Sequence, residues 1–200
     1  FGETAGESTQ YINSLLKVAT KMHKSPAQMA KEFRTAQDQI GYDAKKTWST
    51  FTALQAQSKA TGLEMQTLID TAASMDTFSG ASKVAQQVNA ILGSTLNGSE
   101  LMMMDLEDRV VAIQDAFKSS GMTLQDLNDG PMGRQLSMAL RDALGARSIG
   151  EMKRMMTASA SERDKWQATL QDGTGPLKQG AGLDSKAIEK GFKIKIIIRK

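Results

Sequence analysis

The chain has 200 residues, enough for one domain or for two small ones. It contains no cysteine, which excludes disulfides, thiolate chemistry and cysteine-based metal sites and leaves the compartment undetermined. Its formal net charge of +3 is too small to indicate nucleic-acid binding. Aromatic residues make up only 5% of the sequence, so we expect a core of aliphatic side chains and of methionine, of which there are 13.

The positive charge is concentrated at the C-terminal end. Residues 176–200 carry seven basic and two acidic residues, whereas the rest of the chain has a net charge of −2. The sequence starts at Phe1 without a charged-then-apolar leader, and it holds no apolar run of roughly twenty residues. We therefore expect no signal peptide and no membrane-spanning helix. We interpret the missing initial methionine as the mark of a piece of a longer protein.

Two helices are predicted between residues 8 and 41. Ser8 or Thr9 is the expected N-cap of the first, because a side-chain oxygen there can accept a hydrogen bond from a free backbone N–H. In the second helix, Ser25-Pro26 supplies the cap and the first turn, and Gly41 is the expected end. Apolar residues recur along this second helix at i, i+4, i+7 and i+11: Met29, Phe33, Ala36 and Ile40.

A third helix is predicted from about Ala44 to Ala60, carrying Trp48, Phe51 and Leu54. Three helices with short joins favour a hairpin or a small bundle over residues 1–60. The same spacing would suit a coiled coil between copies of the chain, and the stripes are too short to decide between the two.

Residues 61–157 are predicted to form a compact module of several helices. Three apolar stripes recur at helical spacing: Val84, Val88, Ile91 and Leu92; Leu106, Val110, Ile113 and Phe117; and Met132, Leu136, Ala139, Ala143 and Leu144. Each stripe makes one apolar face on a helix of 3.6 residues per turn. Because such a face is unstable in water, the helices must fold onto each other or onto a partner.

The ends of these helices also have recognisable residues. Three start signals resemble capping boxes: Thr61-x-x-Glu64, the weaker Thr123-x-x-Asp126, and Ser148-x-x-Glu151. Gly93 and Gly121 follow apolar stripes, where a left-handed residue is expected. Pro131 suits the first turn of a helix, since its missing N–H costs nothing there.

The remaining residues are predicted to form a short helix and Gly-rich linker over 158–182, then a basic tail over 183–200. The tail ends in an alternating, strand-like pattern. We therefore predict an all-α fold of several short helices joined by tight turns, elongated or a small bundle, with a lone C-terminal β-like strand.

A strand without a partner in its own chain can add to the edge of another protein's sheet. On this interpretation the predicted partner-binding residues are Phe192, Lys193, Ile194, Lys195, Ile196, Ile198, Arg199 and Lys200. The alternative left open is a disordered basic tail, or an aggregation-prone end that is merely buried.

No catalytic, cofactor or metal site is predicted. His23 is the one histidine, so neither an ordinary zinc site nor a Ser-His-Asp arrangement is expected. Asp105, Glu107 and Asp108 lie where carboxylates favour the dipole of a following helix, and their spacing does not match a calcium loop. The glycines of 173–182 follow no strand and open no helix, which argues against a phosphate loop.

Four features of the central module are shared with a known family: Asp76-Thr77-Phe78 ahead of an Ala/Val helix, Asn89-Ala90-Ile91-Leu92-Gly93, Leu101-Met102-Met103 before Asp105-x-x-Asp108-Arg109, and Ala143-Leu144-Gly145. In these features residues 55–157 resemble part of the tail tape-measure proteins of bacteriophages, in particular the C-terminal region of the contractile-tailed type. The resemblance lies in helix-boundary residues and includes no catalytic signature.

The resemblance implies a non-enzymatic structural protein of the virion. Such a protein is a long, mostly helical polypeptide in the tail tube lumen that sets tail length during assembly and leaves the tube at infection. It implies binding to the baseplate hub and tail tube proteins and to copies of itself, with a homotrimer expected. Contact with membrane or DNA during ejection stays open, and no cofactor is implied.

Two other interpretations are compatible with the sequence. The chain could be a soluble helical scaffold or adaptor unrelated to phages, or the non-catalytic part of a cell-wall-cleaving tape-measure protein. Tail tube and baseplate genes beside this one would distinguish the phage interpretation from the scaffold.

Overall fold

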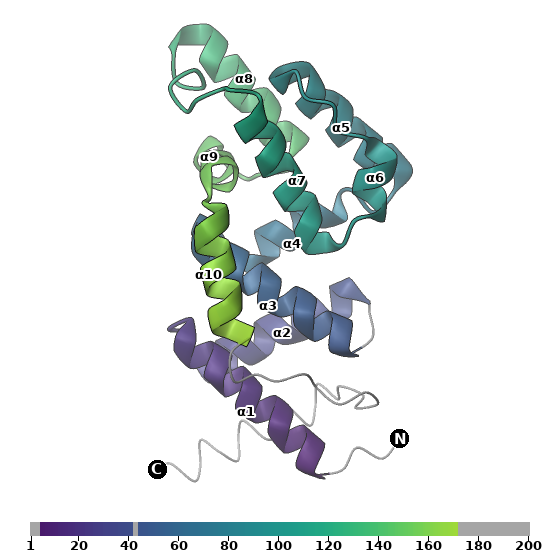
Figure 1. Cartoon of the computed structure of the whole chain (residues 1–200), viewed down its shortest axis with the longest axis vertical. Coiled ribbons are helices and arrows are strands. Elements are labelled where there is room, and N and C mark those ends of the chain that lie inside the picture. Colours follow the sequence, from purple (N-terminus) through teal and green to yellow (C-terminus); the bar gives the residue numbers. More distant parts are fainter. Residues whose placement is uncertain (1–4, 42–43, 172–200) are drawn as a thin grey trace. The chain divides into compact units, whose positions relative to one another are not determined.

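The computed structural model describes residues 5–41 and 44–171. Over these residues the chain forms ten helices and no strand (Figure 1), so the all-α prediction is confirmed there. The helices are α1 (Ala5–Lys21), α2 (Pro26–Ile40), α3 (Ala44–Thr61), α4 (Met65–Ala73), α5 (Phe78–Leu92), α6 (Gly98–Met103), α7 (Leu106–Ser119), α8 (Gly130–Ala143), α9 (Ile149–Thr157) and α10 (Ala160–Gln171). The predicted linker and C-terminal strand lie outside the described residues.

The chain divides into two compact units. The first unit comprises Phe1–Ala56 and Asp164–Lys200, and the second comprises Gln57–Arg163. Helices α3 and α10 contribute residues to both.

The core of the first unit is built around three aromatic side chains. Phe33 from α2 lies edge-on to Trp48 and Phe51 of α3, with ring centroids 5.5 and 4.9 Å apart. The predicted start and stripe of α2 are confirmed: the Ser25 hydroxyl accepts a 3.1 Å hydrogen bond from the Gln28 N–H, and the four stripe residues are buried. Gly41 ends the helix with a φ of 66°, a left-handed conformation that glycine adopts without strain.

The predicted cap of the first helix is wrong. Helix α1 begins at Ala5, so Ser8 and Thr9 lie inside it rather than at its N-cap. Alanine and glutamate, which occupy positions 5 and 7, are good helix formers, and they extend the helix before these two residues.

Helix α1 ends in a Schellman motif with histidine at the left-handed position. The Lys24 N–H donates to the Ala19 carbonyl at 3.0 Å, and the His23 N–H donates to the Thr20 carbonyl at 3.2 Å. His23 has a φ of 55°, where glycine is usual. The exposed imidazole therefore lies beside the helix C-terminus, at a backbone position that strains a residue with a Cβ.

In the second unit, α5 packs on α6 and α8, while α7 packs on α4 and α9. The stripe predicted for α7 is confirmed, because all four of its residues are buried. The α5 stripe is confirmed at Val84, Val88 and Leu92, whereas Ile91 is half-buried at its edge.

The stripe predicted for α8 is wrong in part: Ala143 and Leu144 are buried and Leu136 is half-buried, but Met132 and Ala139 are not buried. Met132 is 68% exposed and Ala139 is exposed, while the buried residues of the helix are Gly133, Ser137, Leu140 and Ala143. Gly133 and Ser137 have little or no apolar side chain. This face of α8 is therefore buried because another segment of backbone approaches it closely. A Cβ on Gly133 would lie 2.4 Å from the Asp126 carbonyl oxygen, and the Ser137 hydroxyl donates to the Leu127 carbonyl at 2.7 Å.

The start signals had mixed outcomes. Thr61 is the last residue of α3, where its hydroxyl donates to the Gln57 carbonyl at 2.7 Å; the capping box predicted at Thr61 and Glu64 is therefore wrong. Glu64 is itself the N-cap of α4 and makes no side-chain cap bond. The Ser148 cap of α9 is confirmed by a 3.1 Å hydrogen bond from the Glu151 N–H.

The reciprocal bonds predicted between Thr123 and Asp126 are present, but they open a run of turns instead of a helix. The predicted left-handed glycines are confirmed by φ values of 65° at Gly93 and 71° at Gly121, and Pro131 lies in the first turn of α8.

Candidate functional site

Arg109 joins three helices of the second unit through its guanidinium. Its side chain starts on α7 and is 5% exposed, yet it carries a full positive charge. The Nη1 group donates to the Ala72 carbonyl at 2.8 Å and to the Asp76 carboxylate. The Nη2 and Nε groups donate to the carbonyls of Met102 at 2.9 Å and Met104 at 3.1 Å.

The same contact brings together residues that are far apart in the sequence. Asp76 and Arg109 belong to two of the features on which the family resemblance rests, and the fold pairs them directly. Thr77, next to this aspartate, caps α5 by accepting a 3.1 Å hydrogen bond from the Gly80 N–H. These feature residues therefore fix the ends of helices and hold them against each other.

Asn89, which belongs to another of these features, organises the loop between α5 and α6. Its Oδ1 accepts 2.7 Å hydrogen bonds from the Ser94 hydroxyl and from the Leu96 N–H. Its Nδ2 donates to the Leu96 carbonyl at 2.8 Å. The loop folds back along α5, and α6 begins with Gly98 against Ser82, whose Cα would lie 2.6 Å from a Cβ at that glycine.

Other buried polar side chains join helices in the same manner as Arg109. The Gln114 amide on α7 donates to the Met155 carbonyl of α9 at 2.8 Å, and the Gln57 amide donates to the Glu107 carbonyl at 2.8 Å. Such bonds satisfy carbonyls that would otherwise lose hydrogen bonds on burial. Their chemistry is structural, since each donor is occupied by backbone.

The acidic cluster ahead of α7 has the predicted arrangement. Asp105 is the N-cap residue of α7, and Glu107 and Asp108 lie in its first turn, where negative charge favours the helix dipole. Across the described ranges 5–41 and 44–171, no group of three potential metal-ligating side chains is present.

Asp126 is a carboxylate with a shifted pKa. Two 2.7 Å hydrogen bonds, the larger contribution from the Thr123 hydroxyl and the other from its backbone N–H, hold the pKa of the Asp126 carboxyl below its ordinary value of 3.8. This group is solvent-exposed and capped by its own turn, so its shift reflects local structure.

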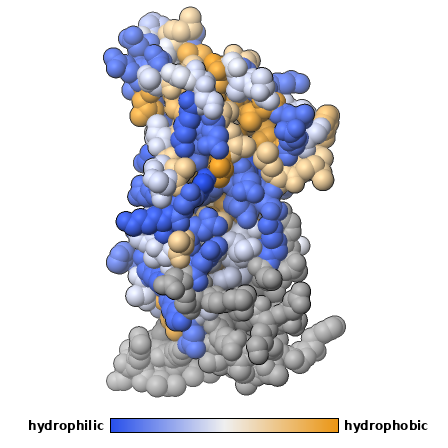
Figure 2. Space-filling model, in the orientation of Figure 1, coloured by the Kyte–Doolittle hydropathy of each residue, from blue (hydrophilic) through white to orange (hydrophobic). Residues whose placement is uncertain are grey.

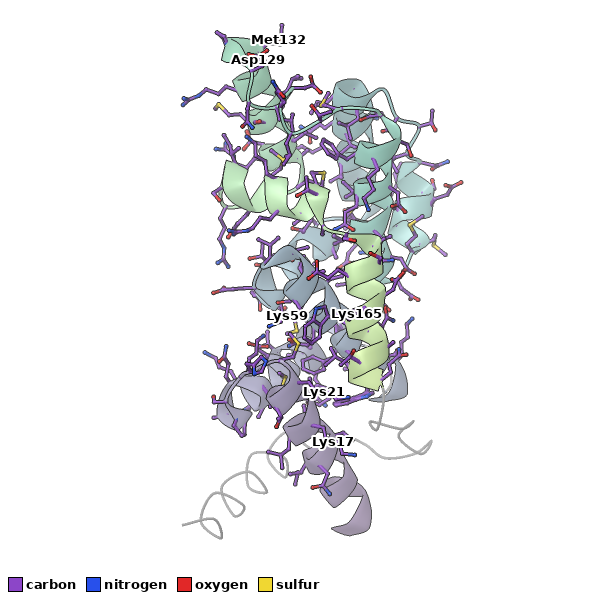
Figure 3. The ribbon with its side chains drawn as sticks, turned by 60° about the vertical axis from the view of Figure 1, so that its left-hand side comes forward. Lys17, Lys21, Lys59, Asp129, Met132 and Lys165 are labelled. Atoms are coloured by element: carbon purple, nitrogen blue, oxygen red, sulfur yellow. The ribbon has the colours of Figure 1, made fainter. Side chains whose placement is uncertain are left out.

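In the first unit, a lysine closes the end of a helix. The Lys21 ammonium from α1 donates to the Thr169 carbonyl in the last turn of α10, where a cation offsets the helix dipole. Figure 3 shows Lys17 and Lys21 one turn apart on α1. Since this ammonium is engaged by backbone, it serves packing in the unit.

The large apolar side chains that are exposed all belong to the second unit within the described part of the chain. They are Phe78, Met103, Leu124, Met132 and Met138. Figure 2 shows apolar atoms at the right-hand edge of this unit, where Figure 1 places α6. Figure 3 shows Met132 beside Asp129 at the N-terminal end of α8, well apart from α6.

The eight predicted partner-binding residues, Phe192 to Lys200 without Ile197, lie outside the described residues. Sequence reasoning missed Arg109 as an organising residue and missed the exposure of Met103. A signal for the first was present: Arg109 follows Leu106 by three positions and precedes Val110, so it falls on the apolar face of α7.

None of the helices in the described ranges is both long and apolar enough to cross a membrane. No protein-family model, curated protein or solved structure matches the chain.

Proposed function

We propose that the chain is a non-enzymatic segment of a tail tape-measure protein of a contractile-tailed bacteriophage. In this proposal the segment lies in the tail tube lumen near the baseplate, binds the hub and tube proteins, contributes to tail length and is released at infection. The proposal also includes association between copies, as a homotrimer. Contact with membrane or DNA belongs to the ejection step.

The observation that carries the proposal is the position of the residues on which the resemblance rests. Asp76 and Arg109 pair, Thr77 caps α5, and Asn89 builds the loop before α6. These residues act at helix boundaries, which supports the proposal because the resemblance consists of boundary residues. The all-helical fold of the described residues agrees with a largely helical polypeptide.

The non-enzymatic character is supported by the chemistry that the sequence provides. There is one histidine and no cysteine, and a general acid–base or nucleophilic mechanism needs side chains that converge on one place. A peptidoglycan or peptide hydrolysis assay tests this part: turnover that a single substitution abolishes would contradict it.

Hub binding is assigned to Phe192–Lys200 on the basis of its alternating pattern, which would place Ile194, Ile196 and Ile198 on one face of a strand. Backbone hydrogen bonds to a sheet edge would give affinity, and Lys193, Lys195, Arg199 and Lys200 would meet acidic groups.

The test of hub binding is co-purification of the tagged chain with hub proteins, with and without residues 192–200. The truncated chain is expected to keep its far-ultraviolet circular dichroism and to lose the hub proteins. A chain in which Lys193, Lys195, Arg199 and Lys200 are replaced by glutamine keeps the apolar face, so its recovery of hub proteins relative to the full chain measures the contribution of the basic residues. Unchanged recovery of hub proteins after the truncation would refute this assignment, and failure of the full chain to recover them would favour the scaffold interpretation.

A further inference from the structure

Two exposed apolar side chains belong to residues close in sequence to the hydrogen-bond partners of Arg109. Phe78 is 60% exposed and Met103 is 79% exposed. Phe78 follows the paired Asp76 by two residues, and Met103 lies between two residues whose carbonyls accept hydrogen bonds from Arg109. One buried guanidinium therefore holds both in the same region of the second unit. We call the following residues the Phe78–Met103 surface: Asp76, Phe78, Glu100, Met103 and Asp108.

The packing of α6 does not depend on the side chain of Met103. That helix is anchored by buried Leu101 and by Gly98 against α5, so Met103 is free to face solvent. Methionine is flexible and polarisable, and it is frequent on surfaces that adapt to a partner. An exposed phenylalanine near an exposed methionine is the kind of apolar patch that marks interaction sites on soluble proteins.

The charged residues around this surface are mainly acidic. Residues 98–108 contain four acidic residues and no basic residue. Glu100 and Asp108 are exposed, and the Asp76 side chain is 53% exposed. Among nearby cations, Arg109 is buried in its hydrogen bonds, and Lys83 on α5 is exposed. An apolar centre with acidic residues around it complements a partner that is apolar on one side and basic at its edges.

The secondary structure limits how such a partner can bind. The described residues of the second unit are helical and offer no sheet edge, so strand addition is not available there. The strand-like C-terminal pattern of this chain is therefore a poor match. The exposed Met132 of a second copy is also a poor match for this surface. Met132 lies beside Asp129, so its binding would bring Asp129 close to the acidic residues of the surface.

We propose that the Phe78–Met103 surface binds a cationic amphipathic helix of another protein. The apolar stripe of that helix covers Phe78 and Met103, and its basic residues lie beside Glu100, Asp108 and the free side of Asp76. This inference stands apart from the function proposed above and needs neither a tail tube nor a hub.

The probe is a fluorescent synthetic helix of leucine and lysine about eighteen residues long, which makes five turns. Its affinity for the full chain is measured by anisotropy at low and at high salt. The variant with Phe78→Ser and Met103→Ser is expected to raise Kd by about tenfold or more, because two apolar contacts are lost. The variant with Glu100→Gln and Asp108→Asn is expected to raise Kd by roughly three- to tenfold at low salt and to flatten the salt dependence.

Met132→Ser is the control, because it removes a methionine of α8 that is also exposed, at 68%, and it is expected to leave Kd unchanged. Circular dichroism checks that every variant stays folded. The proposal is overturned if the probe does not bind at low salt, or if the double variant with Phe78→Ser and Met103→Ser leaves its Kd unchanged. It is also overturned if a peptide of residues 186–200 binds more tightly than the probe. Self-association of the chain that the same double variant abolishes would overturn it as well.

Discussion

Replacing Arg109 with methionine tests whether hydrogen-bond donors, and not the bulk of the side chain, hold the second unit together. Methionine keeps an unbranched apolar stem but leaves the carbonyls of Met102 and Met104 without the guanidinium donor, whereas the Ala72 carbonyl keeps the Met75 N–H at 3.1 Å. A buried acceptor that loses its partner costs about 1–3 kcal/mol, although water can reach those nearest the surface. We therefore expect Arg109→Met to lower the free energy of unfolding by roughly 2–4 kcal/mol, because two buried acceptors lose their donor.

Two further variants separate charge from geometry. Asp76→Asn removes the ion pair alone, and because the Asp76 side chain is 53% exposed, it is expected to cost at most about 1 kcal/mol. Arg109→Lys keeps the charge but cannot reach four acceptors, so its cost should fall between those of the other two variants. Lys118→Ala is the control, since its ion pair with Asp115 is long, at 3.9 Å, and exposed.

The assay combines urea unfolding followed by circular dichroism with amide hydrogen exchange resolved by peptide. Arg109→Met should lose protection first in α4, α6 and α7, the helices that the guanidinium joins. The reasoning is refuted if Arg109→Met is as stable as the wild type within about 0.5 kcal/mol, or if Asp76→Asn costs as much as Arg109→Met.

Other substitutions give distinct expectations. Gly98→Ala should destabilise the fold by about 1–3 kcal/mol, because its Cβ would lie 2.6 Å from Ser82. Gly150→Ala, whose Cβ would have its nearest neighbour at 3.7 Å, should stabilise the fold by up to ~1 kcal/mol. The urea midpoints of the two variants test this, and equal effects would contradict the packing of α6 on α5. His23→Gly should raise the thermal midpoint, because glycine relieves the strain of the left-handed backbone at this position. Once the greater entropy that glycine gives the unfolded chain is subtracted, the expected gain in the free energy of unfolding is roughly 0.5–1 kcal/mol. No gain would mean that His23 makes a compensating contact. The lowered pKa of Asp126 means that its ionised form stabilises the fold above its ordinary value of 3.8 and loses this contribution as pH falls through the lower folded value. Asp126→Asn should therefore be less stable than the wild type at neutral pH and equal to it in strong acid, and a constant difference at both would refute the assignment.

The helices that sequence patterns predicted well are those whose inward face is mainly apolar. Every buried residue of α2 is apolar, and in α7 the buried residues are apolar apart from Arg109 and Gln114, so periodicity identifies the buried side of both helices. In α8 the inward face includes Gly133 and Ser137, which a search for apolar residues cannot select. That face is decided by how closely a neighbouring turn approaches, which is a property of the tertiary structure.

The candidate sites show the same limit. A buried arginine is rare without a partner, and its partners here are mainly backbone carbonyls of residues whose side chains give no sign of the contact. Thr61 and Glu64 match a capping box in sequence, yet the threonine hydroxyl bonds backward to Gln57 and ends a helix instead. In α3, residues 50–58 are all buried, including Thr50, Thr52 and Gln55. The sequence predicted this helix, but a helix buried on all sides has no amphipathic pattern that would indicate the extent of its burial.

The most direct test of the proposed function is an electron cryomicroscopy image of purified phage tails that carry the chain with a density label inserted in the Gly-rich segment 173–182. The account predicts label density inside the tube lumen at the baseplate end in full tails, and none there after ejection. Label absent from purified tails, or present on the outer surface of the tube, would contradict it.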